Sequence, residues 1–223
     1  MSGKPVKLTS EAIVDKALVL AGEHGLGSLS MRKLAAAMGV QAMSLYNHID
    51  GRDDLVARLV ERVVSEYEVP RIGPDWMEAM KRRARSMHGV LLRRPWAVAP
   101  LLSRRNSGPN MFRFVDATLG VLVTAGFSYE LADYAWNAMD NHVFGFTMQE
   151  ANFPIERGEY ADVAREYQDS IDAGNYPYLS RMSPLVMNGE YSGLHDFDFG
   201  LDIILDGLEA MLPGRRKRRP PVP

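Results

Sequence analysis

The chain has 223 residues, 46% of them hydrophobic, and a formal net charge of -2 at pH 7. This length and apolar content can bury a sizeable core, in one large domain or in a small domain joined to a larger one. The lack of cysteine excludes a disulfide framework and a thiolate site, which fits a reducing compartment. The near-neutral charge excludes a surface that grips nucleic acid over its whole extent, so any such binding must be local.

The sequence shows no sign of secretion or of membrane insertion. The first seven residues, MSGKPVK, lack the apolar stretch of a signal peptide. The longest uncharged apolar stretch, around residues 117–129, is too short to span a bilayer. We therefore expect a cytoplasmic protein with no membrane partner.

Residues 29–48 indicate two short helices joined by a tight turn. Leu34, Ala35 and Met38 recur at the spacing of one helix face, which predicts that this face is buried. Ser30 precedes the first helix, where its side-chain oxygen can cap free amides, and Gly39 follows it, where a left-handed residue can end it. This pattern is typical of a helix-turn-helix, whose second helix enters the major groove of DNA.

The second helix of this pair would carry the base-reading side chains. If Leu45 points inward, Gln41 and Asn47 lie on the outer side, where amide groups can donate to and accept from base edges. The hydroxyl of Tyr46 and the imidazole of His48 suit phosphate oxygens. The segment is thus predicted to read duplex DNA.

Charge around this motif is only weakly positive. Residues 1–48 contain five basic side chains and three acidic ones, so hydroxyl groups and helix N-termini would share the phosphate contacts. Two other basic runs are interpreted differently: 81–85 as a solvated helix face and 213–223 as a basic disordered tail. A single copy of the motif is therefore expected to bind DNA poorly and to need a second copy.

The remainder of the chain is predicted to be helical. Pro70, Gly73 and Pro74 form a break that places a domain boundary between residues 68 and 74, and Asp75 can cap a helix over 75–94. Further helices are predicted over 110–125 and 128–151, one exposed helix within 159–172, and a loop with one short helix within 174–193. No segment keeps the alternation of a strand, so the fold class is all-α.

The last helix is apolar over a wide arc, which predicts partners on two sides. Its stripe pairs by spacing with small and apolar residues of the 128–151 helix. The predicted dimer-interface residues are Ala132, Ala135, Met139, Phe197, Leu201, Ile204 and Leu208. An ordinary core within one chain is the alternative, and the spacing alone leaves both open.

The middle helices mix aromatic and polar side chains as a small-molecule pocket does. The candidate ligand contacts are Trp96, Phe112, Trp136, Asp140 and Phe146. Each of these residues would also suit a helical core without any ligand, and periodicity does not separate the two roles.

The chain resembles the TetR family of bacterial transcriptional regulators. The likeness is carried by the runs Leu34-Ala35, Met38-Gly39-Val40, Ser44-Leu45-Tyr46-Asn47-His48-Ile49 and Arg52-Asp53-Asp54-Leu55, with apolar positions of the flanking helices. The resemblance implies an N-terminal three-helix helix-turn-helix domain at 1–68, joined to a larger helical domain for ligand binding and dimerisation at 74–212. The DNA-contacting residues it implies, together with the outer face of the motif, are Arg32, Gln41, Ala42, Met43, Ser44, Tyr46, Asn47, His48 and Arg52.

The C-terminal part looks most similar to the tetracycline-repressor branch of that family. That branch uses a histidine and a glutamate around its magnesium-bound drug, and Leu101 and Gln149 stand at those places here. We therefore expect no metal and no cofactor, and an effector other than magnesium-tetracycline.

Two functions remain open at this point. The sequence holds no His-Glu-x-x-His, no phosphate-cradling glycine loop and no cysteine nucleophile, so we do not expect an enzyme. The favoured function is a homodimeric repressor that binds a palindromic operator and is released by a small molecule. The alternative is a helical bundle that binds other proteins and has no specific affinity for DNA.

Overall fold

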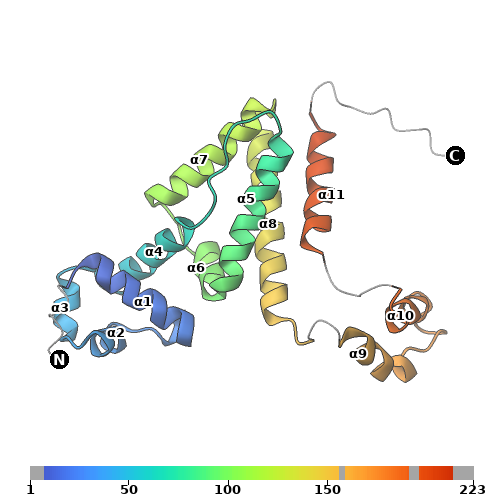
Figure 1. The fold of residues 1–223 in the computed structure, drawn as a ribbon, viewed down its shortest axis with the longest axis horizontal. Coiled ribbons are helices and arrows are strands. Elements are labelled where there is room, and N and C mark those ends of the chain that lie inside the picture. The colour runs from blue at the N-terminus through green and yellow to red at the C-terminus, as the bar shows by residue number, and fades with distance from the viewer. Residues whose placement is uncertain (1–7, 156–158, 191–195, 213–223) are drawn as a thin grey trace.

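The computed structural model describes residues 8–155, 159–190 and 196–212, and every regular element in those ranges is a helix (Figure 1). This confirms the all-α prediction. The α-helices are α1 (Ser10–His24), α2 (Met31–Met38), α3 (Ala42–Tyr46), α4 (Gly51–Val64), α5 (Trp76–Arg93), α6 (Val98–Ser103), α7 (Pro109–Thr124), α8 (Tyr129–Asn152), α9 (Tyr160–Glu166), α10 (Leu179–Met187) and α11 (Phe197–Glu209). The predicted tail at 213–223 lies outside the described residues. None of the described helices is long and apolar enough to cross a membrane.

Several helix ends form as the side chains predict. Ser30 caps α2 by accepting a hydrogen bond from Lys33 N at 3.2 Å, and Gly39 ends that helix in the left-handed conformation, at φ 68°. Asp75 caps α5 in the same way, through Glu78 N at 3.0 Å. These caps confirm the turn of the helix-turn-helix and the start of the long helix that follows residue 75.

Helix α4 belongs to two hydrophobic cores at once. One face gives Leu55 and Leu59 to the small core of α1, α2 and α3, while the other gives Val60 and Val63 to the large core of the remaining helices. Trp96 packs against both cores. Helices α1 to α3 and the helices of the large core therefore share one connector, and they meet along α4 rather than only at the break near residue 70.

A side chain of α4 also caps a helix of the large core. The carboxylate of Glu61 accepts hydrogen bonds from Asn110 N at 2.9 Å and from Met111 N at 3.2 Å, at the start of α7. A Cβ at residue 108 would lie 1.9 Å from the Glu61 carboxyl carbon, so only Gly108 leaves room for this contact. Movement of α4 is thereby tied to the first turn of α7.

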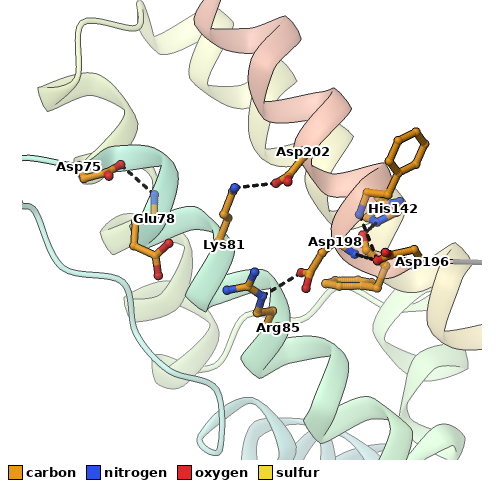
Figure 2. A network of polar contacts seen from close by, with 10 residues as sticks. Asp75, Glu78, Lys81, Arg85, His142, Asp196, Asp198 and Asp202 are labelled. Carbon is orange, nitrogen blue, oxygen red and sulfur yellow. Dashed lines mark hydrogen bonds and ion pairs between the residues drawn. The ribbon is translucent and has the colours of Figure 1, made fainter.

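Helix α11 lies against α5 and α8, and ion pairs join it to α5 (Figure 2). Lys81 Nζ lies 2.6 Å from Asp202 Oδ1, and Arg85 Nε lies 2.8 Å from Asp198 Oδ1. Arg83, on the same helix, has no exposed surface at all. The prediction that residues 81–85 form a solvated face is wrong for Arg83, because its position follows the buried stripe of α5.

Helices α9 and α10 pack on each other and lie beyond the main bundle, near the end of α8 (Figure 1). The segment exposes several apolar side chains, including Tyr178 and Met182. Its two short helices agree with the predicted looser connection between the last two long helices of the bundle.

Candidate nucleic-acid interface and regulatory core

Helices α2 and α3 present their polar side chains outward. Leu45 and Ile49 are buried and fix α3 on the small core, whereas Met43 is 72% exposed and Tyr46 is 49% exposed. Of the predicted DNA contacts, Arg32, Gln41, Met43, Tyr46, Asn47 and Arg52 are exposed, and Ala42, Ser44 and His48 are half-buried. The predicted residues thus gather around one short helix and the helices beside it.

Arg52 has a structural role that the sequence did not indicate. Its guanidinium donates from Nε to Leu29 O at 3.3 Å and from Nη2 to Leu26 O at 3.2 Å. These bonds hold the start of α4 against the connection between α1 and α2. In the free protein Arg52 is therefore a positioning residue, and two of its donors are already engaged.

The five predicted ligand contacts do not form one cluster. Trp136 donates from Nε1 to Asp140 Oδ2 at 2.6 Å, so these two lie together on α8. Phe146 packs on a separate aromatic group with Phe197, at 5.4 Å between ring centroids, and Phe112 is 59% exposed. Trp96 lies between the two hydrophobic cores. Only Trp136 and Asp140 of the five share a polar contact.

Asp140 belongs to a buried polar network centred on Arg83. Arg83 donates from Nε to Thr118 Oγ1 at 2.8 Å and from Nη1 to Asp140 Oδ1 at 2.7 Å. Its Cζ atom lies 4.5 Å from the centre of the Phe114 ring. The network therefore joins α5, α7 and α8. Sequence analysis missed it, although Arg83 falls three residues after Met80 and four before Met87, both of which are buried.

Tyr67 borders the same network from the segment that follows α4. Its ring lies 5.1 Å from that of Phe114, and the residue is only 5% exposed. Burial raises the pKa of the Tyr67 phenol well above its usual range, with a further contribution from the Asp140 carboxylate. The phenol is thus protonated at neutral pH and can donate a hydrogen bond.

A second polar group lies around His88 on the other side of α5. His88 Nδ1 lies 2.8 Å from Thr147 Oγ1, its Nε2 lies 3.1 Å from Glu150 Oε2, and its ring stacks on Phe197 at 4.3 Å. Burial lowers the pKa of His88, and the Glu150 carboxylate opposes this shift only in part. The group fastens α5 to α8 and to the start of α11.

The predicted dimer residues are mostly core residues of one chain. Ala132, Ala135, Met139 and Leu201 have no exposed surface, and Leu208 is 7% exposed, because α8 and α11 turn these sides toward α5 and toward each other. Phe197 and Ile204 are half-buried. These five residues pack within one chain, and their predicted contacts with a second chain stay a prediction. Other apolar side chains there are exposed: Tyr134 and Met148 on α8, Phe199 and Ile203 on α11, and Met211 just after α11.

The residues that the structure describes do not suit a metal. The Leu101 side chain offers only carbon atoms, and within the described ranges no three histidine or acidic side chains lie close enough to hold an ion. A cleft of about 670 Å³ lies between α1, α4 and residues 105–110, where the small core meets the large one. None of the predicted ligand contacts lines that cleft.

Comparison with known proteins identifies both parts of the chain. Residues 13–59 match the family model described as bacterial regulatory proteins, tetR family, and residues 69–212 match that of the tetracyclin repressor-like C-terminal domain. An HTH-type transcriptional regulator of Saccharopolyspora erythraea is 32% identical over 93% of this chain and 86% of its own length. The class C tetracycline repressor of Escherichia coli is 30% identical over 92% of each chain.

A solved structure shares the whole architecture. The ActR protein of Streptomyces coelicolor, in complex with actinorhodin, superposes with a TM-score of 0.78 at 31% identity, over 95% of this chain and 100% of that one. The helix-turn-helix at α2 and α3, the connector α4 and the larger helical core correspond to the two matched family models. The chain belongs to the TetR family of bacterial transcriptional regulators, and it is a ligand-responsive DNA-binding regulator.

Proposed function

We propose that this protein is a homodimeric repressor that binds a palindromic operator in the cytoplasm and is released from it by a small molecule. The exposed polar face of α3, held on a core that α4 shares with the regulatory helices, carries this proposal. Residues 1–68 would read DNA and residues 74–212 would bind the effector and the second chain. The protein acts by binding alone, with no catalytic step.

The exposed apolar side chains of α8 and α11 support the dimer. Phe199 is 67% exposed, Ile203 59% and Met211 62%, and Tyr134 and Met148 extend this surface along α8. Exposed apolar residues gathered on neighbouring helices mark an association surface. A twofold axis at this surface would pair α8 and α11 with the same helices of a second chain. It would thereby set the spacing between the two helix-turn-helix regions, the reading heads of the dimer.

The contact of Glu61 with α7 supports a route from effector to DNA. Helix α7 carries Thr118, which belongs to the Arg83 network, and its first amides are capped by Glu61 of α4. An effector that displaced α7 would move α4 and change the distance between the two reading heads. Release follows if the effector prefers the dimer geometry that no longer fits successive major grooves.

The relatives support an organic effector. The class C protein is named a tetracycline repressor, and ActR was solved with actinorhodin. We propose that this chain likewise binds an organic small molecule in its regulatory core, next to Trp136 and Asp140.

Two substitutions on the reading head test the assigned roles. Gln41→Ala should relax discrimination at one base position, by about 1–3 kcal/mol, because an amide that reads a base edge is lost. Tyr46→Ala should weaken binding to all duplexes about equally, because a phosphate contact carries no sequence information. Binding to the selected operator and to its single-base variants separates the two. Equal losses on every duplex for both variants would contradict the roles, and Tyr178→Ala, at an exposed tyrosine outside α8 and α11, serves as the control.

A further inference from the structure

The cleft between α1, α4 and residues 105–110 has no part in the proposed function. Its volume of about 670 Å³ falls within the range of small-molecule sites. Helix α4 lies between α1 and the start of α7, so the cleft lies beside the connector of the two cores (Figure 1). A molecule bound in it would contact the small core and the large core together.

The apolar lining of the cleft comes from both cores. Val14 belongs to the small core and is 8% exposed, whereas Val60 belongs to the large core and is 1% exposed. Ala57 and Pro109, both exposed, add further apolar surface to the lining. An apolar chain or ring placed here would remove this surface from water and gain free energy by doing so.

Three guanidinium groups also line the cleft. Arg58 and Arg62 are one turn apart on α4, and Arg105 comes from the segment before α7. Within the described residues Arg105 is exposed and has no hydrogen bond or ion pair. Arg58 bonds Asp54 only through Nε, and Arg62 bonds Asp15 only through Nη2. Several donors around the cleft are therefore left for an acceptor from outside the chain.

The two acidic residues of the lining already face positive partners. The Glu61 carboxylate accepts from the amides of Asn110 and Met111 at the start of α7. Glu11 lies in the first turn of α1, where the helix dipole favours a negative charge. Arg105 has no such compensation. The charge left uncompensated in the cleft is therefore positive, which favours an anion over a cation.

We propose that this cleft is a second ligand site, separate from the effector site in the regulatory core, and that it binds an organic carboxylate with an apolar body. The carboxylate accepts hydrogen bonds from Arg105 and from the remaining donors of Arg58 and Arg62. The apolar body lies on Val14 and Val60. Because the arginines belong to α4 and to the segment before α7, the bound ligand ties the connector to the large core.

Four probes test this chemistry on the full-length protein. They are octanoate, the neutral 1-octanol, the cation octylammonium, and acetate, which has the charge without the apolar body. In ligand-observed NMR titrations octanoate should bind about tenfold more tightly than 1-octanol or acetate, and octylammonium should bind more weakly than 1-octanol. Equal affinities of octanoate and 1-octanol, equal affinities of octanoate and acetate, or a preference for octylammonium would each overturn the proposal.

Two substitutions separate the charge from the shape of the cleft. Arg105→Gln should lower the affinity for octanoate about fivefold and leave that for 1-octanol unchanged, because only the charged contact is lost. Arg71→Gln, at an exposed arginine outside the cleft, should change neither affinity.

Ala57→Trp should lower both affinities at least tenfold by filling the cleft, and the exposed position leaves the fold intact. Ala36→Trp, at an exposed alanine of α2 outside the cleft, is its control. Octanoate binding that survives either Arg105→Gln or Ala57→Trp unchanged would overturn the proposal.

Nuclear Overhauser effects locate the bound probe. The methylene protons of octanoate should show contacts with the methyl groups of Val14 and Val60, which line the cleft. Contacts with Trp136 in their place would assign octanoate to the regulatory core and overturn the second site. All these titrations are made without DNA, so they are independent of operator binding. If a palindromic duplex is bound and octanoate shows no preference, the cleft site is wrong and the regulator stands.

Discussion

The helix-turn-helix region (α2 and α3), called the reading head, and the large helical core use polar side chains in opposite ways. Gln41, just before α3, and Tyr46, at its end, face solvent, and the helix is held in place by its apolar side. In the core, Arg83 and Asp140 are locked to each other and to neighbouring helices at distances near 2.7 Å. Exposed polar residues without a partner in the fold can be substituted without loss of stability. Polar residues that are hydrogen-bonded to buried partners cannot. Substitutions should therefore affect DNA binding in the first region and stability in the second.

The largest effect is expected from breaking the buried ion pair. Arg83→Met should lower the free energy of unfolding by about 3–5 kcal/mol, because Asp140 keeps its charge and loses its cation. Urea unfolding measures the change. Arg82→Met, at an exposed arginine one residue away, should cost no more than about 0.5 kcal/mol. Equal losses of unfolding free energy in Arg83→Met and Arg82→Met would contradict the contrast between buried and exposed polar groups.

The exposed apolar face of α11 should matter for assembly and not for the fold of one chain. Ile203→Glu should weaken dimerisation by about 2–4 kcal/mol, because a carboxylate would be placed in an apolar contact. Sedimentation at several protein concentrations would show a monomer where the parent chain is a dimer. Ile72→Glu, at an isoleucine of similar exposure outside α8 and α11, is the matched control. A dimer of unchanged affinity would place the interface elsewhere.

The junction between the two regions should respond to a single methyl group. Gly108→Ala should cost about 1–2 kcal/mol, because the added carbon displaces Glu61 from the amides of α7. In the Glu61→Ala background the same change should cost less than about 0.5 kcal/mol. Gly22→Ala, with open space around its Cβ position, should be neutral or stabilising. Additive effects of the two junction changes would show that the cost of Gly108→Ala does not act through Glu61.

The smallest effect is expected from pH, through His88. Burial lowers its pKa in the folded chain, so the unfolded chain takes up the proton at higher pH. This group leaves stability unchanged at pH 8, and the free energy of unfolding falls as the pH drops below about 6.5. His88→Gln should flatten that part of the urea-midpoint profile, whereas exposed His24→Gln should not. Parallel profiles for the parent chain and His88→Gln would contradict the assignment.

The same contrast explains what the sequence could predict. Caps, turns and helix periods are local, so Ser30, Gly39 and Asp75 occupy the cap and turn positions that the local sequence predicts. The core site depends on residues far apart in the chain: Arg83 meets Thr118 and Asp140 across 35 and 57 positions. A charged residue on the buried stripe of a helix resembles a solvated one until its partners are known, which is why the predicted solvated face is wrong at Arg83.

The apolar surfaces of α8 and α11 show the same limit of local sequence patterns. The wide apolar arc of the last helix predicts packing on two sides, but periodicity does not say which side faces which neighbour. Ala135 and Leu201 face the core of their own chain, and Ile203, two residues after Leu201 and on the opposite side of α11, faces outward. Which side of each helix is exposed depends on how α8, α11 and α5 cross, and no local sequence pattern contains that information.

Selection of bound duplexes from a random pool tests the central claim most directly. The account predicts an enriched palindrome whose half-sites are one helical turn apart and which binds two chains. The selected duplex should lose affinity when either half-site is replaced. An enriched sequence without twofold symmetry, or no enrichment above the starting pool, would contradict the homodimeric operator-binding repressor proposed here.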